Sequence, residues 1–161
     1  KLESGSVPLD RVDLDAHALL DHVASEWREP AAARSVRLDV VSAADAVEVP
    51  ADPQRLHQVV ANLVANAVRH APVGGHVQLS AGWVGDRARI EVADDGPGID
   101  PEDAERVFER FYRSDRARAA DDGGTGLGLA IARWIVELHG GTIRADPRHP
   151  HGCRMVVELP R

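Results

Sequence analysis

Lysine is almost absent from this chain of 161 residues, in which Lys1 is the only lysine and arginine occurs 18 times. P-loop nucleotide-binding proteins and eukaryotic-type protein kinases each place a lysine against the phosphates of ATP. The sequence therefore excludes both of these classes. Cysteine is as scarce, because Cys153 stands alone, and one cysteine provides neither a disulfide nor a cysteine metal cluster within a chain.

Long apolar runs and an excess of positive charge are missing too. No apolar run approaches the roughly 18 residues of a membrane span, and residues 1–10 lack the apolar stretch of a signal peptide. The net charge of −7 opposes non-specific binding of nucleic acid, which needs a basic face. With 43% hydrophobic and 28% charged residues, the composition is typical of one globular domain. We expect a cytoplasmic domain that contacts neither nucleic acid nor membrane.

The chain divides into a polar connector over residues 1–12 and a folded domain over residues 13–161. Asp15 is placed to cap one helix, and Asp52 followed by Pro53 is a typical start of another. Gly85-Asp86 between two alternating apolar segments predicts a hairpin turn. The expected elements are helices over 15–33, 52–70, 101–109 and 127–139, strands over 37–41, 46–49 (closed by Pro50), 76–83, 87–93, 142–145 and 153–159, and a mobile loop over 114–126.

The helix expected over 52–70 has an apolar face and a polar face. Its apolar residues recur with the spacing of a helix that packs on a core, whereas Asn62 and Asn66, four residues apart, share a second stripe with Arg69 and His70. Asparagine is a poor helix former, so two of them inside a helix need a reason. An amide oxygen suits a hard cation. We therefore expect Asn66 on the polar face, outside the core, where it can bind such a cation.

Two glycine-rich segments flank the mobile loop. The first, Asp94-Asp95-Gly96-Pro97-Gly98-Ile99, follows directly on a strand, and the second, Gly123-Gly124-Thr125-Gly126-Leu127-Gly128-Leu129, leads into a helix. Glycines allow the backbone to approach a phosphate, and the start of a helix adds its positive dipole end. A carboxylate at a strand end, such as that of Asp94, can accept a hydrogen bond from the amino group of adenine. The pattern predicts a nucleotide site.

The order of these motifs, with Phe108-x-x-Phe111-Tyr112-Arg113 between the glycine segments, resembles the catalytic and ATP-binding domain of bacterial two-component sensor histidine kinases, the Bergerat-type ATP-binding fold. The resemblance covers nearly the whole chain, from 12 to 160. It implies an α+β two-layer sandwich in which three helices cover one face of a mixed β-sheet, with a flexible ATP lid. It also implies a dimerisation domain before the connector and a full-length protein anchored in the cell membrane.

The resemblance also implies an activity and its residues. Mg-ATP would give its γ-phosphate to a histidine on the dimerisation domain, from which the receiver domain of a response regulator obtains it. Asn66, as the Mg²⁺ ligand, and Arg113, against the γ-phosphate, would be catalytic, Asp94 would bind the adenine amino group, and Phe108 and Phe111 would anchor the lid in the core. The other implied nucleotide-binding residues are Asn62, Arg69, His70, Gly96, Gly98, Ile99, Gly124, Gly126, Leu127 and Gly128.

The phosphoacceptor segment of the family, a histidine followed by an acidic residue and a proline, has no counterpart here. His22 lies in Asp21-His22-Val23-Ala24-Ser25, which lacks that pattern, and the remaining histidines show no metal-ligand spacing, so surface or packing roles are expected for them.

Three alternatives to a histidine kinase stay open. Clamp ATPases of the gyrase, chaperone or mismatch-repair type have a glutamate one turn before the metal-binding asparagine, where this chain has Asn62. Serine kinases that act as anti-sigma factors are a second alternative, although the long lid favours the histidine kinase. A scaffold that binds ATP without catalysis is the third.

Overall fold

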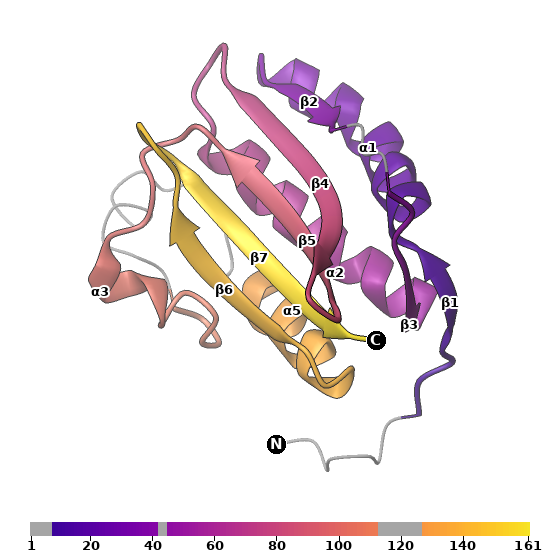
Figure 1. Cartoon of the computed structure of the whole chain (residues 1–161). Coiled ribbons are helices and arrows are strands. Elements are labelled where there is room, and N and C mark those ends of the chain that lie inside the picture. The colour runs from indigo at the N-terminus through magenta and orange to yellow at the C-terminus, as the bar shows by residue number, and fades with distance from the viewer. Residues whose placement is uncertain (1–7, 42–44, 113–126) are drawn as a thin grey trace.

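The main sheet of the protein has five strands. The computed structural model describes residues 8–41, 45–112 and 127–161 (Figure 1). The strands of the main sheet, in spatial order, are β2 (Arg37–Val40), β4 (His76–Val84), β5 (Arg87–Asp94), β7 (Cys153–Pro160) and β6 (Thr142–Pro147). In this sheet β2 runs parallel to β4, and all other neighbours are antiparallel, so the predicted mixed sheet is confirmed.

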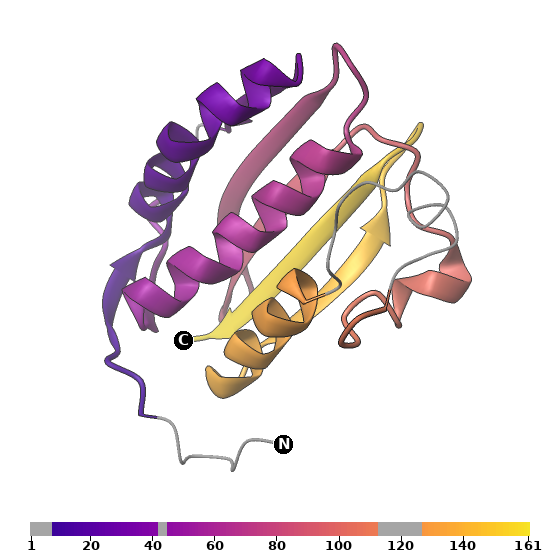
Figure 2. The same cartoon turned by 180° about the vertical axis from the view of Figure 1, so that it is seen from behind.

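Three helices cover one face of this sheet, as expected (Figure 2). They are α1 (Ala16–Ala33), α2 (Pro53–His70) and α5 (Gly128–Leu138). Asp15 and Asp52 cap the first two, since their carboxylates accept hydrogen bonds from backbone N–H groups of the first turn. A fourth helix, α3 (Pro101–Ala104), lies beside β6.

The core lies between the helices and the sheet. The apolar face predicted for α2 is buried, and the alternating residues of β5 and β7 meet it from the sheet side. Burial of each large apolar side chain stabilises the fold by about 1.5–3 kcal/mol. The largest fully buried side chains include Leu20, Leu56, Leu63, Leu79, Ile90, Ile135, Met155 and Leu159.

Three expectations about the elements need correction. Residues Val12–Asp15 form a strand, β1, which pairs antiparallel with β3 (Glu48–Ala51) in a separate two-stranded sheet. Pro50 does not close β3 but lies within it. Proline has no N–H to donate to a neighbouring strand, but it is tolerated here because both strands of a two-stranded sheet are edge strands. The helix expected over 101–109 is limited to α3, and turns follow it.

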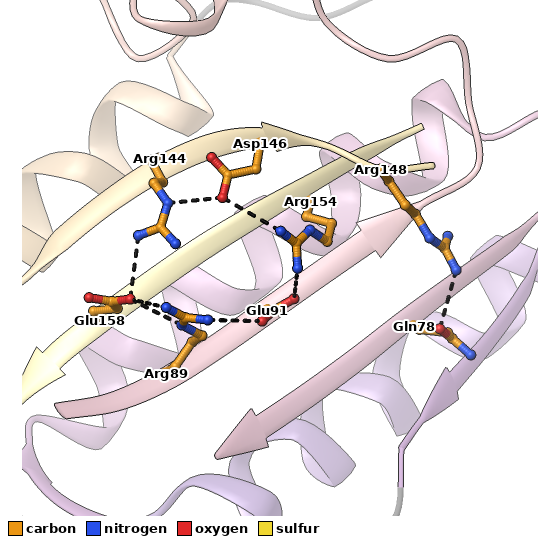
Figure 3. A network of polar contacts seen from close by, with 8 residues as sticks. All are labelled: Gln78, Arg89, Glu91, Arg144, Asp146, Arg148, Arg154 and Glu158. Carbon is orange, nitrogen blue, oxygen red and sulfur yellow. Dashed lines mark hydrogen bonds and ion pairs between the residues drawn. The ribbon is translucent and has the colours of Figure 1, made fainter. Parts of the chain in front are cut away.

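The other face of the main sheet carries polar side chains of β4, β5, β6 and β7, together with the side chain of Arg148, which follows β6 (Figure 3). Glu158 accepts from Arg89 at 2.7 Å and pairs with Arg144 at 3.4 Å, and Asp146 pairs with Arg144 and Arg154. These charges neutralise one another across the strands, and such partly exposed pairs are each worth about 0–1 kcal/mol. The face without helices is therefore polar, and the apolar side chains of the sheet point to the helices.

Within the described residues no helix is long and apolar enough to cross a membrane.

His139 joins the end of α5 to the beginning of α2. The N–H of Asp52 donates to His139 Nε2 at 3.1 Å, and the oxygen of Ile135 accepts from Nδ1 at 2.9 Å. A carbonyl only accepts and an N–H only donates, so the ring is neutral and carries its proton on Nδ1. Burial, together with the positive charges of Arg11 and Arg55, lowers the pKa of His139 below 6.5 despite the hydrogen bond to Ile135. The packing role expected for histidines is correct here.

We predict that the free energy of unfolding falls as the pH drops below about 6.5, because the unfolded chain then binds a proton at His139 that the folded chain does not. His139→Gln, whose amide oxygen can still accept from Asp52, should flatten this pH dependence. His139→Leu should lose about 1–3 kcal/mol at pH 7.5, since it leaves a buried N–H without an acceptor. Urea unfolding between pH 5 and 8 measures both effects, with His17→Gln as the control. An unchanged slope in His139→Gln would show that another group titrates.

Candidate nucleotide site

The polar stripe of α2 faces the beginning of α5. Asn62 Nδ2 donates to the backbone oxygen of Gly128 at 3.0 Å, which ties α2 to the first residue of α5. One turn later, Asn66 Oδ1 accepts from Arg69 Nη2 at 3.1 Å. Asn66 is only 5% exposed, so this part of the polar stripe is buried, although Asn66 is not among the residues of the hydrophobic core. In this structure the buried amide oxygen is therefore paired with a positively charged side chain.

Asp94 is a buried carboxylate at the end of β5, with 4% exposure. Its Oδ1 accepts from the N–H of Gly96 at 2.9 Å. Burial raises the pKa of Asp94, and the hydrogen bond from Gly96 opposes this only in part. The structure therefore maintains a carboxylate where its charge is costly, which is typical of a functional group.

The first glycine segment lies against the end of α2. A Cβ on Gly96 would approach the backbone oxygen of His70 to 2.5 Å, so no other residue fits between Asp94 and the helix. Gly98 has φ +86°, a backbone conformation that side chains disfavour. Ile99 is half-buried and packs against the core. The segment is thus a close turn around Asp94.

Two residues that sequence reasoning missed hold this turn in place. Both carboxylate oxygens of Asp95 accept from the N–H of His76, at 3.0 and 3.1 Å, which ties the turn to the start of β4. Gly152, with φ +114°, lies so close to the backbone of Asp94 that a Cβ would collide with it. The doubled acidic residue in Asp94-Asp95 was a signal for the first of these contacts, whereas nothing in the local sequence pointed to the second.

The second glycine segment is described only from Leu127 onward. Leu127 is the N-cap of α5 and has no side-chain oxygen, so its side chain does not cap the first turn. N–H groups at such a helix start suit an anion. Arg113, Gly124 and Gly126 lie outside the described residues.

The two phenylalanines, Phe108 and Phe111, behave differently from each other. Phe108 is buried in the core, as expected. Phe111 is 62% exposed, with φ 64°, and its ring lies under the guanidinium of Arg110. The expectation that Phe111 anchors the lid in the core is therefore wrong, because its left-handed backbone turns the side chain outward.

The helix α2 thus joins both halves of the candidate site. Asn62 contacts the start of α5, Asn66 and Arg69 lie in between, and His70 contacts the turn that holds Asp94. The model of the histidine kinase-, DNA gyrase B- and HSP90-like ATPase family matches residues 51–161, which include all of these residues. The chain belongs to this family.

The curated proteins to which this chain is similar include sensor proteins and histidine kinases. The chain is 44% identical over 138 residues to the sensor protein IrlS of Burkholderia pseudomallei, covering 86% of this chain and 29% of IrlS. It is 37% identical over 158 residues to the signal transduction histidine-protein kinase BaeS of Escherichia coli, covering 98% of this chain and 34% of BaeS. The chain thus spans about a third of the length of these curated relatives.

A solved structure agrees with the fold. Full-length ShkA in complex with AMPPNP superposes on this chain with a TM-score of 0.85 at 29% identity, covering 97% of this chain and 32% of ShkA. The Bergerat-type α+β sandwich implied by the sequence is therefore confirmed.

We predict that Asp94→Asn raises the melting temperature at pH 8. An amide can still accept from Gly96, but it carries no buried charge. Because the pKa of Asp94 is raised in the folded state, ionisation of this carboxyl group lowers the stability of the fold at pH values above that pKa. The group has no such effect below about pH 4, where it is protonated in both the folded and the unfolded state. The gain should therefore shrink toward pH 4. Thermal unfolding at several pH values measures it, and a loss of stability at pH 8 would show that the carboxylate is structural.

Proposed function

We propose that this chain binds Mg-ATP and presents the γ-phosphate to a histidine on a separate dimerisation domain of a sensor histidine kinase. A response regulator would then take the phosphate from that histidine. The observation that carries the proposal is the buried carboxylate of Asp94, enclosed by Gly96 and the end of α2. The similarity to sensor histidine kinases, and to a kinase structure that holds AMPPNP, supports it.

The residues around Asp94 fit an adenine base. A carboxylate has about four acceptor positions, so the bond from Gly96 leaves room for an amino group. Guanine has an oxygen at the corresponding position and would meet the carboxylate with a repulsive lone pair. Gly96, Gly98 and Ile99 would shape the pocket around the base. This arrangement favours ATP over GTP.

The opposite half of the site fits phosphates and a hard cation. Asn66 would hold Mg²⁺ through its buried Oδ1, while Arg69, His70 and the N–H groups after Leu127 and Gly128 would bind phosphate oxygens. Mg²⁺, when bound, neutralises phosphate charge and orients the phosphoryl group. Gly124, Gly126 and Arg113 are assigned to the phosphates through the family resemblance.

Two features favour phosphoryl transfer to another domain over hydrolysis. Asn62 occupies the place of the water-activating glutamate of clamp ATPases, and its amide cannot take a proton from water. In this structure that amide instead donates to Gly128. His22 lies on α1, within the folded domain, and pairs with Glu26. We therefore infer that the acceptor histidine and the dimerisation domain lie outside residues 13–161, in a full protein anchored in the cell membrane.

We predict that Asp94→Asn weakens ATP binding by about 1.5–3 kcal/mol, the worth of a hydrogen bond to a charged group. It should also reduce the preference for ATP over GTP, because an amide donates as well as accepts. Calorimetric titration with both nucleotides measures this. Asp146→Asn, which removes a carboxylate from the far face of the sheet, is the matched control. Equal affinities of Asp94→Asn and the unaltered chain would exclude Asp94 from the base pocket.

The transfer itself is tested with γ-labelled ATP. The chain alone should bind Mg-ATP, hydrolyse it very slowly and acquire no label. Addition of a separate dimerisation domain with its histidine should give labelled domain, weakly, because the effective concentration of a covalent link is missing. Acid-labile label at His22 would overturn the assignment of the acceptor. Rapid release of phosphate would favour a clamp ATPase, label on a serine of a partner would favour a serine kinase, and binding without any transfer would favour a scaffold.

A further inference from the structure

We propose that His22, Glu26 and His57 form a binding site for a divalent transition-metal ion of the Zn²⁺ type. One ring nitrogen of each histidine and a carboxylate oxygen of Glu26 all lie within 4.8 Å of one another. Two of these residues belong to α1 and the third to α2, and the two helices run side by side on the same face of the sheet (Figure 2). A metal ion here would connect them.

The helix geometry brings the three side chains together. His22 and Glu26 are one turn apart on α1 and so share a face. His57 extends from the second turn of α2 toward the same carboxylate, and its Nε2 lies 2.6 Å from Glu26 Oε1. The two imidazole rings are 5.4 Å apart between centroids and tilted by 51°. The carboxylate thus lies between two imidazoles.

Both histidines form ion pairs with Glu26, and the two pairs differ in length. The pair between His57 and Glu26 is a good hydrogen bond, but His22 Nε2 is 3.6 Å from Glu26 Oε2, beyond hydrogen-bond distance. In a tetrahedral zinc site, ligand atoms at about 2.0–2.2 Å from the metal are about 3.3–3.5 Å from each other. The separations from Glu26, 2.6 Å to His57 and 3.6 Å to His22, lie on either side of this spacing and involve different oxygens of the carboxylate, so the side chains would rotate for one oxygen and two nitrogens to hold an ion.

The donor set determines the class of metal. Two imidazole nitrogens and one carboxylate oxygen suit Zn²⁺ and neighbouring transition metals, whereas Mg²⁺ and Ca²⁺ prefer oxygen ligands. Three protein ligands leave a fourth position for water. The side chains of His22, Glu26 and His57 are 63%, 43% and 33% exposed, so an ion can enter from solvent.

This site is separate from the candidate nucleotide site. His57 faces Glu26 of α1, whereas Asn62, further along α2, faces Gly128 of α5. A metal that joins α1 to α2 would stabilise the folded chain by mass action without occupying the place of the nucleotide. The inference is therefore independent of the proposed function.

The test is titration of the metal-free, untagged chain with Zn²⁺, followed by calorimetry and by the melting temperature. We expect one ion per chain and a melting temperature that rises with Zn²⁺ concentration but not with Mg²⁺. His22→Ala, His57→Ala and Glu26→Gln should each lower the Zn²⁺ affinity by at least about tenfold. Substitution of a residue that only hydrogen-bonds to a metal ligand already lowers metal affinity by about that factor. The visible spectrum of bound Co²⁺ should be that of a four-coordinate ion and should be lost in the same variants.

His76→Ala is the matched control, because His76 also pairs with a carboxylate, that of Asp39 at 2.8 Å, but outside this cluster. It should leave Zn²⁺ affinity unchanged, and circular dichroism should show that all the variants are folded. Absence of Zn²⁺ binding to the unaltered chain would reduce the cluster to an exposed ion pair. Binding that survives in both His22→Ala and His57→Ala, or that His76→Ala also removes, would overturn the assignment.

Discussion

The packing of α2 is the constraint on which the rest of the structure depends. Its apolar face is buried against the sheet, and a rigid helix with one face fixed cannot change where its other faces point. The stripe with Asn62, Asn66 and Arg69 is therefore held in one orientation. Because α2 also contacts α1 and α5, both the candidate nucleotide site and the cluster of His22, Glu26 and His57 depend on it.

The site is built from close backbone contacts as much as from side chains. Gly96 lies against the oxygen of His70, Gly98 lies against Gly152, and Asp95 accepts from the N–H of His76. These contacts come from three parts of the chain, and together they surround the carboxylate of Asp94. Burial raises the pKa of Asp94, so the folded protein is less stable when this carboxyl group is ionised. The same burial keeps water from competing for the carboxylate oxygens, and the contacts that bury Asp94 would therefore favour a specific ligand.

The two faces of the main sheet have separate tasks. One face is covered by α1, α2 and α5 and contains the apolar core. On the other face lie charged side chains that pair with one another both along a strand and across neighbouring strands (Figure 3), namely Arg89, Glu91, Arg144, Asp146, Arg154 and Glu158. Charges that are already paired offer little to an anionic ligand, so the chemistry of this domain is concentrated on the helical face and at the strand ends.

Local patterns in the sequence determined most of the elements and pointed to most residues of the candidate site. The caps at Asp15 and Asp52, the periodicity of α2, the hairpin at Gly85 and the order of the glycine segments each depend on neighbours in the chain, and the structure agrees with all of the elements that they predict. Tertiary structure alone decided the pairing of β1 with β3 and the burial of Asn66. It also decided the contacts of His139 with Asp52, of Gly152 with Asp94, and of His57 with Glu26. The strand pairing and these three contacts each join residues at least 30 positions apart, and periodicity and capping act over only a few residues, so nothing local could reveal them.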